Sequence, residues 1–464
     1  MDSTTLYNLS TGGYVASLAL FAVHLVKARK LIIKTGLIVV ACSFLIQTGG
    51  MLLRWIEAGH LEVNATELAI GQKLSGWSWF VVFTQHPPWS NLYEIMIYMS
   101  WGIVMVTLFA EIKWQFAWLR QTGIILALMT LGIAALTDAS IKPLVPALKS
   151  WWIMIHVISA SVAYAAGSIA AFISLFALMK DEKRVPRKKF AAFSMLLMAV
   201  LLFCLGGGGH LLTEQSYFVK LLAHAGDSIV NVFDLANNSA AYLTPMPNAG
   251  WLIIFAVLVH VFGAASLLLS PSKKQVNSIF LLSLLSTVAV FGNMIFHDMR
   301  RTTIVLEDSL SHHLSPAGPW FISFKSHVWS FSLLVLVLLL ECFIAYFLLY
   351  SEKITNKLAA VEKLEGAAYK AISLSFFLMS IVLITGALWA HYAWGRYWAW
   401  DPKETGALAI WLIYAIYLHA RRTAGLFGPF SSVLGVLGFF VIIIGFLGVN
   451  LGLFSDGLHT YGNG

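Results

Sequence analysis

The chain has 464 residues, of which 59% are hydrophobic and 11% charged, and its formal net charge is +8. Soluble domains carry about 25% charged residues, so the composition excludes an ordinary soluble protein. Lys and Arg gather in short segments between apolar stretches, as membrane topology requires, so the positive charge is no sign of nucleic-acid binding. Cys42, Cys204 and Cys342 form no CxxC motif, which argues against thiol redox chemistry.

The apolar stretches predict an all-α polytopic integral membrane protein, because a helix of about 20 residues crosses a bilayer with its backbone hydrogen bonds satisfied. The N-terminus lacks the basic region of a cleavable signal, so we expect the first stretch to remain as a helix. We expect about twelve transmembrane helices, near residues 12–27, 31–54, 92–112, 116–138, 151–179, 190–211, 250–270, 277–297, 327–350, 371–391, 406–420 and 429–453.

Basic residues follow the first, third, fifth, seventh and eleventh of these helices. All five segments then lie on one side of the membrane, which the positive-inside rule makes the cytoplasm. Both termini are therefore expected outside. The opposite segments, 55–91, 212–249, 298–326 and 392–405, are longer and richer in aromatic residues.

The segment 394–405 combines four aromatic residues with a glycine, and we expect it outside the membrane as a flat platform for a large planar aromatic ligand. Gly395 permits a sharp turn, and Asp401 is expected to cap the next helix with Pro402 at its first position. The alternative is an interfacial aromatic belt, although belts scatter Trp and Tyr over many helix ends. The expected platform residues are Trp394, Gly395, Tyr397, Trp398, Trp400, Asp401 and Glu404, with Trp389 as a further candidate and Arg396 and Lys403 as candidate partners of a propionate.

Histidines supply the candidate iron ligands. His156 at the start of the fifth helix and His459 in the C-terminal tail are both expected outside, where two imidazoles can ligate one haem iron. The alternative for each is a polar anchor at the membrane edge. His419 lies within the eleventh helix, where a histidine is a functional-site hypothesis by default, and His24 and His260 share that status more weakly. Four others at outer helix ends are interpreted as structural: His86, His210, His297 and His327.

The segment 86–94 leads into the third helix with an unusually polar sequence. Asn91 or Ser90 can cap that helix, and Glu94 can complete a capping box with Asn91. Capping leaves Tyr93 unexplained, so Asn91, Tyr93 and Glu94 are kept as candidate site residues.

These segments together resemble the CcsA (ResC) family of cytochrome c biogenesis proteins, which carry a tryptophan-rich outer loop, the WWD domain. The run Trp-Asp-Pro-Lys-Glu-Thr at 400–405 is similar to that loop, and Pro-Trp-Ser-Asn-Leu-Tyr-Glu at 88–94 is similar to the N-terminal signature of the family. Segments 152–157 and 457–462 resemble those that carry its two external histidines, and His419 falls at its membrane-embedded haem histidine. The resemblance covers roughly 12–180 and 365–464.

The resemblance implies that haem b enters from the cytoplasmic side, is held by His156 and His459 over the WWD loop, and is attached to the CxxCH thiols of an apocytochrome c. It also implies a CcsB (ResB)-like membrane partner, a thiol-reducing thioredoxin-like protein, and a bacterial cytoplasmic (inner) membrane location with the loop on the periplasmic side. Three segments follow: N-terminal helices (1–182), inserted helices of unknown role (183–365) and the CcsA-like core (366–464). The sequence departs from the family in these inserted helices, in Gly406 where the family usually has tryptophan, and in its longer segment 55–91.

Other functions remain open. The chain could export or relay haem without ligation, or could carry electrons as a membrane cytochrome with bis-histidine haem, although its histidines are not paired along single helices. A secondary transporter would show matching broken helices in both halves, and only Gly206 to Gly209 suggests such a break. No nucleophile–base pair for thioether chemistry is evident, so no catalytic residue is assigned.

Overall fold

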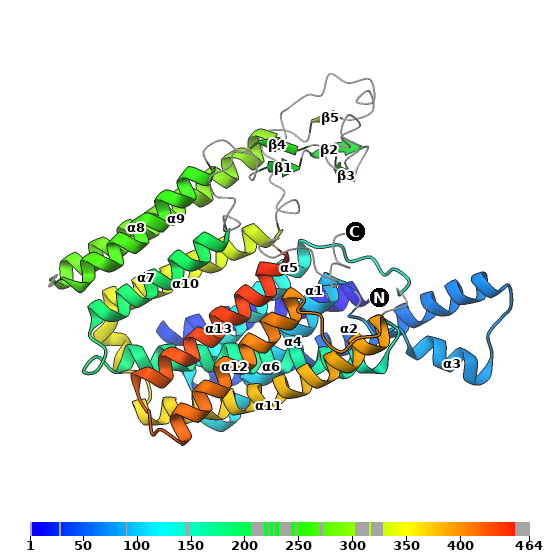
Figure 1. The fold of residues 1–464 in the computed structure, drawn as a ribbon, viewed down its shortest axis with the longest axis horizontal. Helices are drawn as coiled ribbons and strands as arrows, with labels where there is room; N and C mark the ends of the chain where they lie inside the picture. Colours follow the sequence, from blue (N-terminus) through cyan, green and yellow to red (C-terminus); the bar gives the residue numbers. More distant parts are fainter. Residues whose placement is uncertain are drawn as a thin grey trace. The chain divides into compact units, whose positions relative to one another are not determined.

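The computed structural model describes residues 2–26, 29–89, 91–144, 148–205, 218–220, 222–225, 228–231, 243–245, 249–269, 272–301, 315–316 and 328–450. The helices are α1 (Ser3–Val26), α2 (Lys30–Ile70), α3 (Gly76–Thr84), α4 (Leu92–Trp114), α5 (Ala117–Ala135), α6 (Trp151–Lys180), α7 (Arg187–Leu205), α8 (Ala249–Leu268), α9 (Lys273–Arg301), α10 (Val328–Thr355), α11 (Val361–Trp394), α12 (Pro402–Arg422) and α13 (Pro429–Asn450). Figure 1 shows their course.

Five short strands complete the described elements: β1 (Phe218–Lys220), β2 (Leu222–Ala225), β3 (Ser228–Asn231), β4 (Leu243–Pro245) and β5 (Ser315–Pro316). β1 pairs antiparallel with β4, with Val219 opposite Thr244. β2 pairs antiparallel with β3 and β5, with His224 opposite Ile229.

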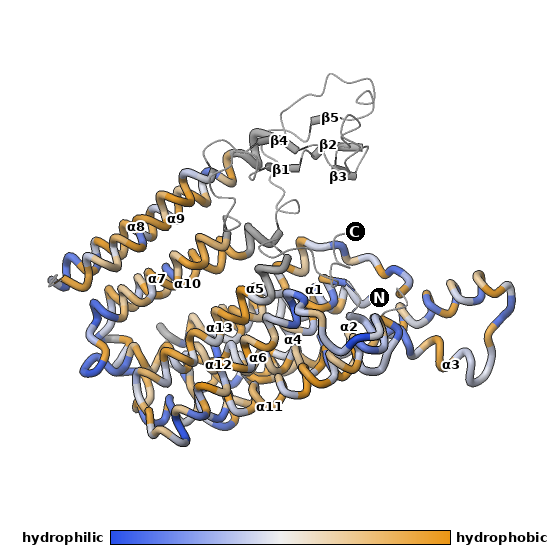
Figure 2. Tube along the Cα trace, viewed as in Figure 1, coloured by the Kyte–Doolittle hydropathy of each residue, from blue (hydrophilic) through white to orange (hydrophobic). Residues whose placement is uncertain are grey.

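The prediction of an α-helical polytopic membrane protein is confirmed. Among the described residues, nine helices are long and apolar enough to cross a membrane, and Pro429–Gly445 is a shorter apolar helix. Figure 2 shows hydrophobic residues along most of the helix lengths and hydrophilic residues near helix ends and turns. The number of about twelve spans and the side on which each terminus lies stay predictions.

The segment 55–91 is more helical than expected. α2 continues from the predicted end near residue 54 to Ile70, where Gly71 adopts φ +69° and donates its N–H to the Glu67 carbonyl at 2.9 Å. α3 then returns along α2, and Figure 1 shows this hairpin projecting from the other helices of its unit. Gly59 makes the return possible, since a Cβ there would lie 2.7 Å from the carbonyl oxygen of Phe83.

The chain forms two compact units. Unit 1 contains the described residues of 1–181 and 357–446, and unit 2 contains those of 182–356 and 447–454. In unit 1 the core lies between α6, α11 and α12, where Tyr414 and Tyr417 are fully buried against Ala163, Ile372 and Met379. Small residues on α6 let the helices approach closely, as is usual in membranes.

Candidate functional site

His156 on α6 contacts α11 directly. Its Nδ1 atom lies 2.9 Å from the backbone carbonyl oxygen of Val382. A carbonyl can only accept, so Nδ1 must carry the hydrogen, and in the neutral ring Nε2 then carries the lone pair. Gly386, one turn further along α11, makes room for the ring, because a Cβ there would lie 3.0 Å from both Nδ1 and Cε1. The imidazole is therefore held in the tautomer that suits an iron ligand bound at Nε2.

The α11 helix, whose Val382 carbonyl accepts the hydrogen bond from His156, also leads into the aromatic loop. Val382, Gly386 and Trp389 follow one face of α11, and Trp389 is buried. Gly395 ends the helix with φ +73°, and its N–H donates to the His391 carbonyl at 2.8 Å. Gly395 is nine positions after Gly386, a rise of about 14 Å along the helix. The predicted turn at Gly395 is confirmed, and a rigid element connects His156 to the loop.

The loop is closed by the cap of α12, as predicted from Asp401 and Pro402. The Asp401 side chain accepts the Lys403 backbone N–H at 2.9 Å, and Asp401 and Glu404 together form a capping box. Glu404 Oε2 also accepts the backbone N–H of Ala399 at 2.8 Å. Between these contacts Trp400 adopts φ +59°, which costs a residue with a side chain about 1–2 kcal/mol. Glu404 therefore holds the backbone on both sides of a strained tryptophan.

The rings do not form the single flat surface expected from the sequence. Trp398 and Trp400 are perpendicular, with centroids 5.7 Å apart, and Trp389 and Trp394 meet at 64° with centroids 4.8 Å apart. The strained backbone at Trp400 is one reason, because it turns successive side chains in different directions. Trp400 and Tyr397 remain more than half exposed.

His391 belongs to the same cluster, and the sequence analysis did not select it. Its ring stacks on Tyr397 at 4.2 Å between centroids with an interplanar angle of 8°. It lies in the last turn of α11, beside the tryptophan-rich segment, which is the signal that could have identified it. Arg396 and Lys403 are both exposed at the loop.

His419 is exposed in the last turn of α12 and borders an open apolar groove of about 380 Å³. The groove is lined by Ala415, Ile416, His419, Ala420, Ala424, Leu426 and Phe430. His419 thus lies on the surface of the bundle, and its groove can accept an apolar molecule from the side.

The structure brings together fewer candidates than the sequence suggested. His459 lies outside the described residues, and so do His210 and His327. His24, near the end of α1, has its Nδ1 atom 3.2 Å from the carbonyl oxygen of Arg29, the residue before α2. His260 belongs to unit 2. The described part of the site therefore consists of His156, the loop that follows α11, and His419 on α12.

Residues 89–214 and 251–455 match the family described as cytochrome C assembly protein. These ranges make up more than half of the chain. The chain belongs to this family, within its CcsA branch. Three of its relatives are named cytochrome c biogenesis protein CcsA. The protein from Trichormus variabilis is 29% identical over 437 residues, which cover 90% of this chain and 95% of the relative. The proteins from Prochlorococcus marinus (26% identical over 427 residues) and Marchantia polymorpha (27% identical over 431 residues) each align with 91% of this chain, and with 83% and 85% of their own lengths.

Membership gives the chain a role in cytochrome c biogenesis, and with the apolar helices it makes the chain a multi-pass membrane protein. The matched ranges begin at residue 89, within the segment 88–94. The contacts of that segment therefore belong to the part of the chain that matches the family.

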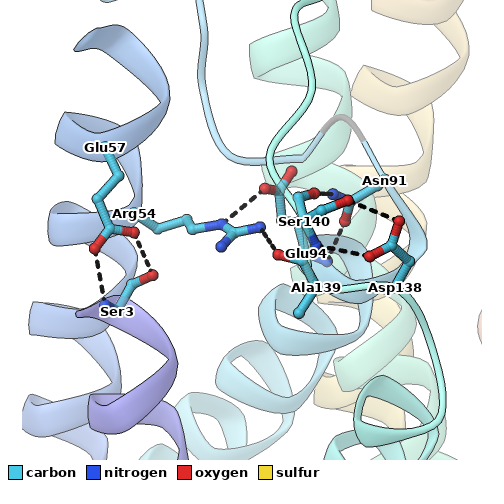
Figure 3. A network of polar contacts seen from close by, with 8 residues as sticks. All are labelled: Ser3, Arg54, Glu57, Asn91, Glu94, Asp138, Ala139 and Ser140. Atoms are coloured by element: carbon cyan, nitrogen blue, oxygen red, sulfur yellow. Dashed lines mark hydrogen bonds and ion pairs between the residues drawn. The ribbon is translucent and has the colours of Figure 1, made fainter. Parts of the chain in front are cut away.

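In this CcsA-family chain, the segment before α4 is anchored by a buried ion pair (Figure 3). Arg54 Nε on α2 lies 2.9 Å from Glu94 Oε1, and Arg54 Nη2 donates to the Ala139 carbonyl at 2.6 Å. Asn91 caps α4 by accepting the Glu94 N–H at 2.9 Å, as predicted. The capping box was expected to use the Glu94 carboxylate as well, but the structure directs that carboxylate to Arg54.

Neighbouring groups extend this network. Asn91 Nδ2 donates to the Ser140 carbonyl at 3.1 Å, and hydrogen bonds from Ser140 lower the pKa of Asp138. Tyr93, which capping left unexplained, is buried under the Arg54 guanidinium at 5.5 Å from its ring centroid. These contacts explain why so polar a segment enters the bundle, since they fasten residues 138–140 to α2 and to the start of α4.

His86 is buried beside a second carboxylate that the sequence analysis missed. Its Nδ1 lies 3.1 Å from Glu62 Oε2, and Glu62 Oε1 lies 2.5 Å from Lys149 Nζ. Glu62 also accepts the Leu144 backbone N–H at 3.1 Å. The contacts support the structural interpretation of His86, since they join the C-terminal part of α2 to the segments before α4 and α6.

Proposed function

We propose that this chain moves haem to the outer face of the membrane and presents it for covalent attachment to an apocytochrome c. The observation that carries the proposal is the fixed tautomer of His156, with its Nδ1 bonded to Val382 on the helix that leads into the aromatic loop. Metal-ligating histidines usually donate their other ring N–H to a carbonyl or carboxylate, which orients the ring and raises its basicity.

The residues present suit haem b as the substrate. His156 offers one axial ligand and His459 is proposed as the other. Tyr397 and Trp400 offer exposed aromatic faces for the porphyrin, and Arg396 offers a cation for a propionate. The perpendicular rings of Trp398 and Trp400 suit a porphyrin that is contacted at both its face and its edge.

The chain would act mainly by positioning. Two protein imidazoles hold the iron, and the histidine of an incoming CxxCH segment displaces one of them. Its thiols then lie beside the vinyl groups of the porphyrin. Holding two reactants in near-attack geometry is itself a large source of rate acceleration. Glu404 and Asp401 contribute by fixing the loop backbone.

His419 is proposed as an earlier haem site, within the membrane. Its groove is apolar and open, as a path for a hydrophobic macrocycle requires, and the imidazole at its edge supplies an iron ligand. The proposal includes a CcsB (ResB)-like partner against this surface, a thioredoxin-like reductant for the apocytochrome thiols, and a bacterial inner-membrane location with the loop on the periplasmic side.

The first experiment is the absorption spectrum of the purified full chain, alone and with His156→Ala or His459→Ala. We expect the wild type to retain haem, each variant to lose it or change its reduced bands, and added imidazole to restore it. Haem retained unchanged in both variants would refute the external ligand pair. A wild type purified without haem, even from cells that supply it in excess, would also count against the proposal.

A second experiment separates attachment from export. The chain is expressed with an apocytochrome c in a strain that lacks its own assembly system, and covalent haem is detected on the cytochrome after denaturing electrophoresis. Attachment that depends on His156 supports the synthase function. Haem that reaches the outer face without attachment, even when a CcsB-like partner is supplied, would favour the exporter.

A further inference from the structure

Unit 2 contains a buried acid–base pair that the proposed function does not use. His260 Nε2 on α8 lies 2.6 Å from Glu341 Oε1 on α10, and both side chains are fully buried. Thr287 on α9 donates its hydroxyl to the same Glu341 oxygen at 3.0 Å. All three residues lie in helices that are long and apolar enough to cross a membrane. Ionisable residues in such places are costly and usually functional.

The hydrogen bonds fix how many protons the pair holds. His260 Nδ1 lies 2.7 Å from the Ala256 carbonyl oxygen, which can only accept, so Nδ1 carries a hydrogen. The contact between Nε2 and Oε1 then needs one further proton, because otherwise a lone pair and a carboxylate would face each other at 2.6 Å. The pair therefore binds one shared proton and has no net charge.

Two features place that proton on Glu341. A neutral acid and a neutral imidazole are favoured over two ions in apolar surroundings, where each buried charge costs several kcal/mol. Glu341 Oε2 is buried and has no hydrogen-bond partner in the described structure, which is more costly for a carboxylate oxygen than for the carbonyl of an acid. The same orientation excludes His260 as an iron ligand in this arrangement, since both of its ring nitrogens are engaged.

We propose that Glu341 and His260 form a proton-binding site inside unit 2, in which Glu341 holds an exchangeable proton as a carboxylic acid that donates to His260. A polar face of α9 leads away from the site, because Ser283, Ser286 and Thr287 are buried and their spacing places them on one face of the helix. Asn277, about 15 Å from Thr287 along the helix, accepts a hydrogen bond from Arg187 at 2.8 Å. Release of the proton would repel Oε1 from Nε2 and loosen the contact between α8 and α10, so proton binding is linked to the packing of the three helices.

The test is infrared spectroscopy of the full chain in lipid bilayers, in water and in heavy water, from acid to alkaline pH. We expect a protonated-carboxyl band at neutral pH that shifts in heavy water, disappears reversibly at alkaline pH and is absent in Glu341→Gln. Glu111→Gln is the matched control. Glu111, like Glu341, has one buried oxygen without a hydrogen-bond partner among the described residues, but its other oxygen lies 2.6 Å from the permanent cation of Arg120, so we expect it to be ionised and to contribute nothing to the protonated-carboxyl band. Its spectrum should keep the band.

A second pair of variants keeps the test decisive if Glu341→Gln does not fold. Thr287→Val removes one hydrogen bond to the carboxyl, and His260→Phe removes the acceptor of its proton, so each should shift the band to higher frequency without abolishing it. A wild type with only ionised carboxylates at neutral pH would overturn the proposal and make the pair a salt bridge. A carboxyl band that persists at alkaline pH in the folded protein would overturn the exchangeable site.

Discussion

His156 and Val382 join α6 to α11 through a hydrogen bond of 2.9 Å between the ring Nδ1 atom and the backbone carbonyl oxygen. The two residues are 226 positions apart in the chain, and residues 182–356 of unit 2 lie between them in the sequence. The contact sets the tautomer of the proposed iron ligand. It also relates that ligand to the aromatic loop, because α11 continues without interruption from Val382 to Trp394.

Gly386→Ala should disturb haem binding through His156. The new Cβ would lie 3.0 Å from the imidazole, so the ring must move and its bond to Val382 must weaken. Loss of such an orienting contact typically lowers metal affinity about tenfold or more. Haem titration and the reduced spectrum measure the effect, and added imidazole should restore haem to the variant.

Gly366→Ala is the matched control, because Gly366 lies on the same helix with nothing within 4 Å of the added methyl group. Equal haem affinity in the two variants would contradict the positioning role of Gly386. If His156→Ala also binds haem normally, the ligand assignment itself is wrong.

Arg54→Met should destabilise the part of unit 1 around the segment before α4. The Arg54 and Glu94 side chains are 4% and 1% exposed, so removal of the cation leaves the buried carboxylate without its ion-pair partner. Such a change costs about 3–5 kcal/mol, whereas Arg54→Met combined with Glu94→Gln leaves no buried charge and should be closer to wild type. Thermal unfolding followed by circular dichroism compares the wild type with these two variants.

Lys142→Ala is the comparison for an exposed pair. Lys142 and Asp138 are 64% and 60% exposed at 3.4 Å, so their ion pair should contribute less than about 1 kcal/mol. An Arg54→Met protein as stable as Lys142→Ala would show that the network in Figure 3 does not support the segment before α4.

Local signals predicted local structure well. The apolar runs located α4 and α13, Gly395 ended α11 in the left-handed conformation, and Asp401 with Pro402 began α12. Each of these features depends on residues that are neighbours in the chain, so its physical cause is contained in a short stretch of sequence.

Contacts between distant residues could not be predicted in this way. Glu94 fits a capping box with Asn91 by its spacing, yet its carboxylate bonds Arg54, 40 positions away. His260 was selected as a membrane histidine, but Glu341 is 81 positions further on. α3 lies in a segment expected as a loop because its stability depends on packing against α2, where His60 contacts the Phe83 ring at 5.3 Å.

Glu404→Ala should loosen the aromatic loop without unfolding the bundle. Glu404 Oε2 accepts the backbone N–H groups of Ala399 and Asp401 at 2.8 and 3.3 Å, on either side of the strained Trp400. Leaving such donors unsatisfied costs about 1–3 kcal/mol, so these amides should exchange with heavy water about tenfold faster or more.

Hydrogen–deuterium exchange of the peptide that contains 396–401 measures this change. Glu404→Gln keeps an acceptor oxygen and should exchange at a rate between the wild type and the alanine variant. Thr405→Ala, at the exposed next position, should exchange as the wild type does. Exchange that is equally fast in all three variants would show that Glu404 does not hold the loop.

Gly406→Trp, which introduces the residue usual in the family, should destabilise this chain. A Cβ at Gly406 would lie 3.2 Å from the Cα of Gly445, so α12 and α13 meet backbone to backbone there and leave no space for a side chain. Overpacking of this kind costs about 1–3 kcal/mol or more, and we expect a lower unfolding temperature than for Gly132→Trp, since Gly132 on α5 has nothing within 4 Å. Equal unfolding temperatures would mean that α13 can shift to admit a tryptophan. A clear loss of stability would mean that this chain combines its aromatic loop with a closer α12–α13 contact than a tryptophan at this position permits.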